Sequence, residues 1–237
     1  MNKFRGLLFN VLYLTSAILY SIPAILITPF LSYRYRVKYY TTWPKLVQWV
    51  LTLTCGIRYQ VIGGEHIPDR PVVVISNHQS SWETFLMFTL FTPITAVLKK
   101  ELVYIPIFGW LLLFTRPIRI DRSKRTSALK DLLSQGKERL EQGTSVLIYP
   151  EGTRVPVGET RPHFSGGAML AVKAGYDILP VVHNSGKFWP AHRLEKNPGV
   201  ITVKVGRPMP TAGRSAKELS KEVETWINQE KEAINQA

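Results

Sequence analysis

Cysteine is almost absent from this chain, and its scarcity excludes two kinds of site. Cys55 is the one cysteine among 237 residues, so the chain cannot form an internal disulfide or a cysteine-rich metal site. The five histidines are scattered without metal-ligand spacing, which argues against a catalytic zinc ion. We therefore expect a site without a metal, in a protein that faces a reducing, cytoplasmic compartment.

Acidic residues are also scarce relative to basic ones. Thirty Lys and Arg against 17 Asp and Glu give a formal net charge of +13. This excess favours an anionic partner, and both nucleic acid and anionic lipid satisfy that condition. The chain also lacks a linker rich in Ser and Gly and an internal repeat, so its length predicts one substantial core with an N-terminal appendage.

Charged residues are missing from a long stretch near the N-terminus. The 28 residues from 6 to 33 carry no formal charge and have basic residues on both sides. A helix needs about 20 apolar residues to cross the hydrocarbon of a membrane, and this run is longer than the apolar core of a signal peptide. Pro23 and Pro29 would kink such a helix, so the pattern allows either a span or a re-entrant hairpin in one leaflet.

The rest of the appendage completes a predicted membrane anchor. Residues 43–55 are too few to span and are expected to form a second helix at the membrane interface. We assign residues 1–55 to membrane-anchoring helices and residues 56–237 to an α/β domain. This anchor favours membrane lipids as the anionic partner, with no nucleic acid. Arg34, Arg36 and Lys38 favour the cytoplasmic side for the end of the first helix, which places the α/β domain on the cytoplasmic face of the membrane.

Strand and helix patterns alternate beyond Gly56. Helical periodicity covers residues 126–140, 168–174 and 215–235. Alternating elements of this kind predict an α/β fold with a mixed, mostly parallel sheet flanked by helices. Runs rich in β-branched residues predict six strands, at 57–62, 72–75, 94–98, 146–149, 178–183 and 200–205, with 72–75 in the centre.

A histidine follows the central strand at the point where that strand ends. His78 lies in the segment SNHQSSWE at 76–83, and a helix is expected to begin after Ser80. With Glu83 in the first turn of that helix, its carboxylate can accept a hydrogen bond from one ring nitrogen of His78 and leave the other free to take a proton. Ser80 and Glu83 also have the spacing of a capping box, in which Glu83 only bonds the backbone of Ser80. These eight residues leave both interpretations open.

Two further blocks carry chemistry. Residues 99–125 hold seven basic and two acidic residues, which suits guanidinium groups converging on a phosphate, although a solvated basic face has the same composition. The segment YPEGTR at 149–154 ends another strand. Gly152 permits close approach of a ligand to backbone N–H groups that could receive an anion or an oxyanion. The plainer alternative is a tight turn in which Glu151 and Arg154 pair at the surface.

Together these blocks resemble the four-motif pattern of the lysophosphatidic acid acyltransferase family, over roughly residues 57–210. The segments NHQSSWE, KKEL, IDR, PEGTR and LPVV occur in the order of that pattern. The resemblance implies that His78 is the general base and Glu83 its partner, and that Pro180 lies toward the acyl donor. The residues it implies for binding the acceptor, with Lys100 added from the basic block, are Lys100, Arg122, Glu151, Gly152, Thr153 and Arg154.

The resemblance also implies a reaction. A fatty acyl group would pass from a thioester, acyl-CoA or acyl carrier protein, to the sn-2 hydroxyl of 1-acyl-glycerol-3-phosphate, giving phosphatidic acid for phospholipid biosynthesis. His78 would remove the hydroxyl proton, which is worth roughly 10²- to 10⁴-fold in rate, and N–H groups near Gly152 or Ser80 would hold the oxyanion. No acyl-enzyme is expected, because Cys55 lies in the membrane-facing part and no serine stands in a Gly-x-Ser-x-Gly elbow. The reaction also needs no cofactor. The basic surface suits either donor, and the pattern gives no oligomeric state.

Two departures from the family pattern keep other functions open. Glu83 stands where the pattern most often has Asp, and the FSGG segment at 164–167 lacks the lysine of a Phe-Lys-x-Gly block. The alternatives are an acyltransferase acting on another lipid alcohol, such as a lyso-ornithine lipid, and a hydrolase or transacylase using Ser80 or Ser81. A third is a non-catalytic membrane-bound protein that binds anionic lipid or nucleic acid.

Overall fold

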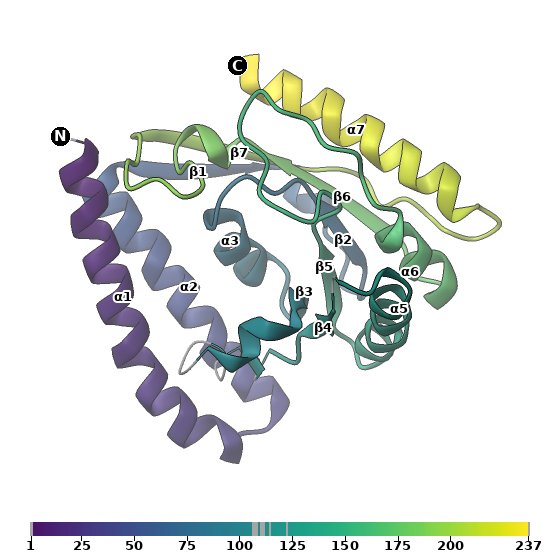
Figure 1. The fold of residues 1–237 in the computed structure, drawn as a ribbon, viewed down its shortest axis with the longest axis horizontal. Coiled ribbons are helices and arrows are strands. Elements are labelled where there is room, and N and C mark those ends of the chain that lie inside the picture. The colour runs from purple at the N-terminus through teal and green to yellow at the C-terminus, as the bar shows by residue number, and fades with distance from the viewer. Residues whose placement is uncertain (1, 106–108, 110–111, 114, 122, 237) are drawn as a thin grey trace.

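A seven-stranded mixed sheet forms the centre of the fold, with helices on both of its faces (Figure 1). The computed structural model describes residues 2–105, 109, 112–113, 115–121 and 123–236. Neighbouring strands run parallel, apart from the antiparallel pair β6 and β7. From one edge to the other the strands are β1 (Ile57–Ile62), β7 (Gly199–Val205), β6 (Ile178–His183), β2 (Val73–Ser76), β5 (Ser145–Ile148), β3 (Ile94–Lys99) and β4 (Ile118–Ile120).

Both faces of the central strand are buried, which explains its unbroken apolar sequence. Val72 and Val74 contribute to one core, which contains residues of α2 (Tyr33–Cys55) and α3 (Trp82–Leu90). Val73 and Ile75 contribute to the core on the opposite face. Helices α5 (Arg125–Glu141), α6 (Gly166–Ala174) and α7 (Ala216–Gln236) pack apolar side chains against the strands in that second core.

The structure confirms the predicted mostly parallel α/β sheet and adds one strand to the six predicted. That strand, β4, continues the sheet beyond β3 through the pairs Val97–Ile118 and Lys99–Ile120. It escaped prediction because it has only three residues and lies inside the basic block. Ile118 is nevertheless fully buried, so part of the segment interpreted as a ligand-binding basic cluster is a sheet edge.

The N-terminal residues form a helical hairpin in place of one long helix followed by a short one. Helix α1 (Asn2–Ile27) contains Pro23, and a short 3-10 helix (Thr28–Phe30) with Pro29 leads into α2. The expected helix at 43–55 is therefore wrong in its start, since α2 begins at Tyr33. Its first turns are aromatic and basic, so they lack the apolar pattern by which sequence reasoning finds a helix. They pair with α1 through aromatic rings, as between Tyr20 and Tyr39, whose centroids are 4.7 Å apart.

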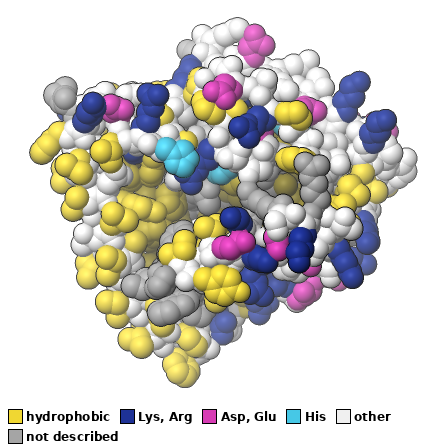
Figure 2. All heavy atoms as spheres, viewed as in Figure 1, with side chains coloured by type: hydrophobic (Ala, Val, Ile, Leu, Met, Phe, Trp, Pro, Cys, Tyr) yellow, Lys and Arg dark blue, Asp and Glu magenta, His cyan; other side chains and the backbone are white. Residues whose placement is uncertain are grey.

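Helix α1 is tied to the core at its start and exposes apolar side chains along its length. A Cβ on Gly6 would lie 1.9 Å from the carbonyl oxygen of Leu194, so glycine permits this close approach. Phe9 is fully buried and packs edge-on against Trp189, with ring centroids 5.0 Å apart. Within the described residues, residues 2–30 are the one helical segment long and apolar enough to cross a membrane, and 17% of its most apolar window is buried. Figure 2 shows hydrophobic side chains gathered over α1 and α2 on the left of that view.

Candidate active site

The sheet topology gathers the predicted motifs at one edge. His78 follows β2, Tyr149 follows β5 and Ser185 follows β6, and these three strands are parallel neighbours. Lys100 and Asp121 follow β3 and β4, which continue the same parallel sheet. The carboxyl ends of parallel strands share one edge, and ligands of open α/β sheets bind in the crevice outside that edge. The candidate active site therefore lies at the carboxyl ends of β2, β5 and β6.

His78 and Glu83 form a hydrogen-bonded pair. The Nδ1 atom of His78 lies 2.7 Å from Glu83 Oε1. The His78 side chain is 17% exposed, whereas that of Glu83 is fully buried. Helix α3 begins at Trp82, two residues later than Ser80, and this places Glu83 in the first turn as expected. Because Glu83 occupies Nδ1, Nε2 is the atom of the ring that is left to take a proton.

The capping-box interpretation also holds, since one carboxylate serves both purposes. Glu83 Oε1 accepts hydrogen bonds from the N–H groups of Gln79 and Ser80, at 2.9 and 2.8 Å. Glu83 Oε2 accepts from the hydroxyls of Ser80 and Ser185, at 2.8 and 2.9 Å. Burial alone would raise the pKa of Glu83, but the neighbouring His183 and the hydrogen bonds from His78 and Ser80 together lower it. Glu83 is thus a carboxylate at neutral pH, and Nδ1 of His78 carries the proton that it accepts.

Glu151 binds the backbone of His78 and so helps to fix its position. Its Oε2 atom accepts a hydrogen bond of 2.6 Å from the N–H of His78, and the N–H of Val155 donates to the carbonyl of His78 at 2.7 Å. Glu151 is 5% exposed, and burial raises its pKa to about 7. Glu151 thus contacts the backbone of His78, and its contact with the acceptor stays a prediction. Both Glu151 and Arg154 are among the described residues, and the structure shows no ion pair between them of the kind that a plain surface turn predicted.

The N–H groups expected to hold an oxyanion already donate within the protein. Gly152, at φ +69°, donates its N–H to the carbonyl of Tyr149 at 3.1 Å. Ser80 donates its N–H to Glu83, as described above. The turn and the helix start thus satisfy these two backbone donors within the protein. Next to them, Thr153 is exposed and Arg154 is partly buried.

Besides Arg154, two basic residues were expected at the acceptor phosphate, Lys100 and Arg122. Lys100 forms an ion pair with Asp121, with Nζ and Oδ2 2.5 Å apart, and both lie at the carboxyl edge of the sheet. Arg122 lies outside the described residues. Asp121 also accepts hydrogen bonds from the N–H and hydroxyl of Ser123 through Oδ1. The pair between Lys100 and Asp121 thus joins the residues that follow β3 and β4.

Sequence reasoning missed the residues at the end of β6 that support the pair of His78 and Glu83. Ser185, fully buried, donates to Glu83, as described above. The side-chain amide of Asn77 exchanges two hydrogen bonds with the backbone of His183, at 2.9 and 3.0 Å, and so extends the pairing of β2 with β6. Ser185 could have been found from the Asn-Ser-Gly segment at 184–186, because this polar segment directly follows a predicted strand. Pro180, expected toward the acyl donor, lies within β6 and is buried.

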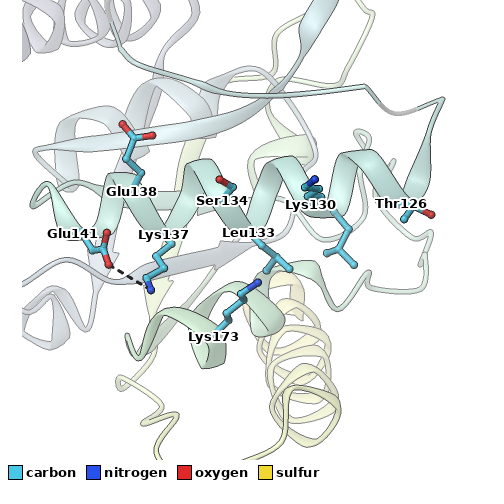
Figure 3. Close-up of a pocket in the computed structure, with 9 residues that line it drawn as sticks. Thr126, Lys130, Leu133, Ser134, Lys137, Glu138, Glu141 and Lys173 are labelled. Carbon is cyan, nitrogen blue, oxygen red and sulfur yellow. Dashed lines mark ion pairs between the residues drawn. The ribbon is translucent and has the colours of Figure 1, made fainter.

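A groove on the outer side of α5 lies apart from these residues. It has a volume of about 580 Å³ and is lined by α5 and by Lys173 of α6 (Figure 3). Lys130 and Lys137 extend over it from α5, and Lys137 pairs with Glu141 at 3.6 Å. The residues lining it are Thr126, Leu129, Lys130, Leu133, Ser134, Lys137, Glu138, Glu141 and Lys173, so it is not part of the His78 site.

Comparison with known proteins identifies the family to which the chain belongs. The family model described as "Acyltransferase" matches residues 58–184, more than half of the chain. The chain belongs to the acyltransferase family. The matched residues contain His78, Glu83, Glu151 and His183, which belong to the site described above.

Relatives extend the likeness over the whole chain. A 1-acyl-sn-glycerol-3-phosphate acyltransferase of Pseudomonas aeruginosa is 42% identical over 97% of this acyltransferase and 91% of the relative. A human protein named 1-acyl-sn-glycerol-3-phosphate acyltransferase beta is 31% identical over 72% of this chain and 62% of its own. The crystal structure of the 1-acyl-sn-glycerophosphate (LPA) acyltransferase of Thermotoga maritima superimposes with a TM-score of 0.82, at 28% identity, over 99% and 98% of the two chains. These findings confirm the resemblance to lysophosphatidic acid acyltransferases. With the apolar helix α1, they indicate that this acyltransferase associates with a membrane.

Proposed function

We propose that this acyltransferase moves a fatty acyl group from a thioester to the sn-2 hydroxyl of 1-acyl-glycerol-3-phosphate and so produces phosphatidic acid for phospholipid biosynthesis. The observation that carries the proposal is the hydrogen bond between His78 and the buried Glu83 at the carboxyl edge of the sheet. The relatives are named as 1-acyl-sn-glycerol-3-phosphate acyltransferases, which suggests the acceptor, and the fold is shared with one such enzyme over nearly the entire chain.

The reaction follows from the state of the His78 imidazole. Glu83 holds the proton on Nδ1, so Nε2 accepts the proton of the sn-2 hydroxyl. The hydroxyl oxygen then bonds to the thioester carbon, and the carbonyl electron pair moves onto the carbonyl oxygen. When this intermediate collapses, the C–S bond breaks and the thiolate leaves with the proton from Nε2. A thiol with a pKa of about 8.5 needs little further help to depart.

We assign the acceptor phosphate to basic residues that follow β3, β4 and β5, at the carboxyl edge of the sheet. We place it near Arg122 and Arg154, with Thr153 and Gly152 beside it, while Lys100 acts through its ion pair with Asp121. The donor is acyl-CoA or acyl carrier protein, and the reaction written above uses no metal and no other cofactor. Residues 1–55 hold the site at the membrane, and the basic residues that follow α1 favour the cytoplasmic face.

The hydrolase alternative is weakened by the position of Ser80. Its hydroxyl is fully buried, donates to Glu83 and accepts the N–H of Trp82 at 2.9 Å. A hydroxyl engaged in both directions and out of contact with solvent is a poor nucleophile for a lipid ester. The structure thus favours direct transfer to an acceptor hydroxyl.

Release of thiol from an acyl thioester tests the proposal. In detergent or vesicles, the full chain should release thiol from acyl-CoA only when 1-acyl-glycerol-3-phosphate is added, with one phosphatidic acid formed per thiol. A direct transfer has no acyl-enzyme to accumulate, so no burst of thiol should precede addition of the acceptor. A stoichiometric burst without acceptor that disappears in Ser80→Ala or Ser81→Ala would replace this proposal with the serine-dependent one.

Replacing Arg122 with alanine tests which lipid is the acceptor. If Arg122 binds the acceptor phosphate through its planar guanidinium, Arg122→Ala should raise the KM for 1-acyl-glycerol-3-phosphate about tenfold or more and leave the KM for the donor unchanged. Steady-state kinetics with each substrate varied in turn give both constants. Arg70→Ala is the control, because Arg70 pairs with Asp177 at a distant surface. Equal effects on both KM values would remove Arg122 from the phosphate site. Preference for a phosphate-free lipid alcohol would favour the lyso-ornithine type of acceptor.

A further inference from the structure

The aromatic ring of Tyr149 lies flat against the imidazole of His78. The centroids of the two rings are 4.0 Å apart, and their planes differ by 10°. Tyr149 is the first residue after β5, and β5 pairs in parallel with β2, the strand that leads to His78. The stacking is therefore built into the register of the sheet.

Contacts beyond the imidazole fix the orientation of the Tyr149 ring. Its hydroxyl lies 3.3 Å from Thr84 Oγ1 on α3, and the ring packs against the core on that face of the sheet. Burial raises the pKa of Tyr149 well above its ordinary value of 10.0, so the phenol stays neutral when the enzyme works. The imidazole thus faces a neutral π-system whose negative face points toward it.

The stacking and the hydrogen bond restrict different motions of His78. The bond from Nδ1 to Glu83 fixes the direction in which the ring edge points, but it allows the ring plane to tilt about that bond. Contact with a parallel ring at 4.0 Å prevents the tilt. Glu83 and Tyr149 together therefore determine where Nε2 points.

We propose that Tyr149 is a positioning residue that also stabilises the positive charge which His78 acquires during transfer. When Nε2 takes the hydroxyl proton, the acceptor oxygen bonds to the thioester carbon, and the imidazole becomes a cation over the face of Tyr149. A cation within about 6 Å of an aromatic centroid is attracted to the negative face of the ring. The charge disappears when the proton leaves with the thiolate, so the attraction is strongest between the two steps and lowers the barriers on either side of them. This inference rests on the proposed role of His78 as the base.

Variants of Tyr149 separate the ring from the hydroxyl. Tyr149→Leu removes the π face, and we expect kcat to fall about tenfold with the KM for the acceptor unchanged. The acidic limb of its pH–rate profile should move to lower pH by about one unit, because the imidazolium is less stabilised. Tyr149→Phe keeps the ring, so its kcat and pH profile should stay within about twofold of wild type. Thr84→Val removes the hydrogen-bond partner of the hydroxyl and is expected to behave like Tyr149→Phe.

Titration of the His78 imidazole by NMR provides a readout besides activity, with the signal assigned by its loss in His78→Gln. We expect the titration midpoint of the His78 signal to move to lower pH in Tyr149→Leu and to stay in place in Tyr149→Phe. Thermal melting checks the fold of each variant, and Tyr149→Met replaces Tyr149→Leu if the latter does not fold. The proposal is overturned if Tyr149→Phe and the aliphatic variant lose activity equally while the titration midpoint of His78 stays in place in both. It is also overturned if the aliphatic variant keeps both the activity and the His78 titration midpoint of wild type. Retained activity in His78→Ala would instead reject the base itself, so the two failures are distinguishable.

Discussion

Replacing His78 with alanine should lower the rate of acyl transfer by about 10³-fold. The imidazole is the group that takes the proton of the acceptor hydroxyl, and general-base assistance of this kind is worth roughly 10²- to 10⁴-fold. The fold should survive, because Glu83 keeps four hydrogen-bond donors after the imidazole is removed, from Gln79, Ser80 and Ser185. Formation of labelled phosphatidic acid at saturating donor and acceptor measures the change in kcat.

A second histidine provides the matched control for this variant. His192 is exposed and has a φ of 60°, a conformation that asparagine tolerates, so His192→Asn should keep wild-type turnover. Circular dichroism of His78→Ala should match that of wild type. A folded His78→Ala enzyme with near-normal kcat would show that the proton is removed by another group. If His78→Ala instead leaves the protein's function intact and binding depends on salt alone, the protein would be the non-catalytic binder of anionic lipid or nucleic acid.

The fold was largely predictable because burial on both faces gives the central strands an unbroken apolar sequence. The run from Val72 to Ile75 marks such a strand without any other signal. Strand β4 (Ile118–Ile120) lacks such an apolar run, because it has three residues and the middle one is an arginine. The beginning of α2 was missed for a related reason. Its stability comes from aromatic packing against α1, and such tertiary contacts do not appear as periodicity in one segment.

The candidate site was predictable where its partners are close in sequence. His78 and Glu83 are five residues apart, so local geometry allowed their contact, and the resemblance to the family favoured it over a simple cap. The contacts of Glu151 with His78 and of Ser185 with Glu83 join residues 73 and 102 positions apart. Those contacts exist because β5 and β6 flank β2 in the sheet. The order of strands in a sheet cannot be predicted from the residues of any single segment. Sequence reasoning therefore identified Glu151 but not its contact with His78, and it did not find Ser185.

Replacing Glu83 with glutamine should lower kcat about 10²- to 10³-fold while the protein stays folded. Glutamine has nearly the same shape, and the hydroxyls of Ser80 and Ser185 can rotate to accept hydrogen bonds from its amide. The amide lacks the charge that stabilises the imidazolium, and if its N–H₂ group faces Nδ1 it selects the tautomer in which Nε2 cannot accept a proton. Glu83→Ala would be less informative, because five donors would lose their acceptor in a buried place.

The pH dependence of stability separates the charge of Glu83 from its role as a cap. The pKa of Glu83 is lowered from its ordinary value of 4.5, so its ionisation contributes stability above that pH, and this contribution is lost as the pH falls further. Glu83→Gln should therefore lose less of its Tm than wild type when the pH is lowered from 5 to 3, and the two proteins should change alike between pH 7 and 5. Glu65→Gln, at an exposed carboxylate, should follow wild type in both Tm and kcat. If Glu83→Gln is folded, has the expected flatter pH profile of Tm and still turns over normally, then Glu83 caps α3 and does not orient the base.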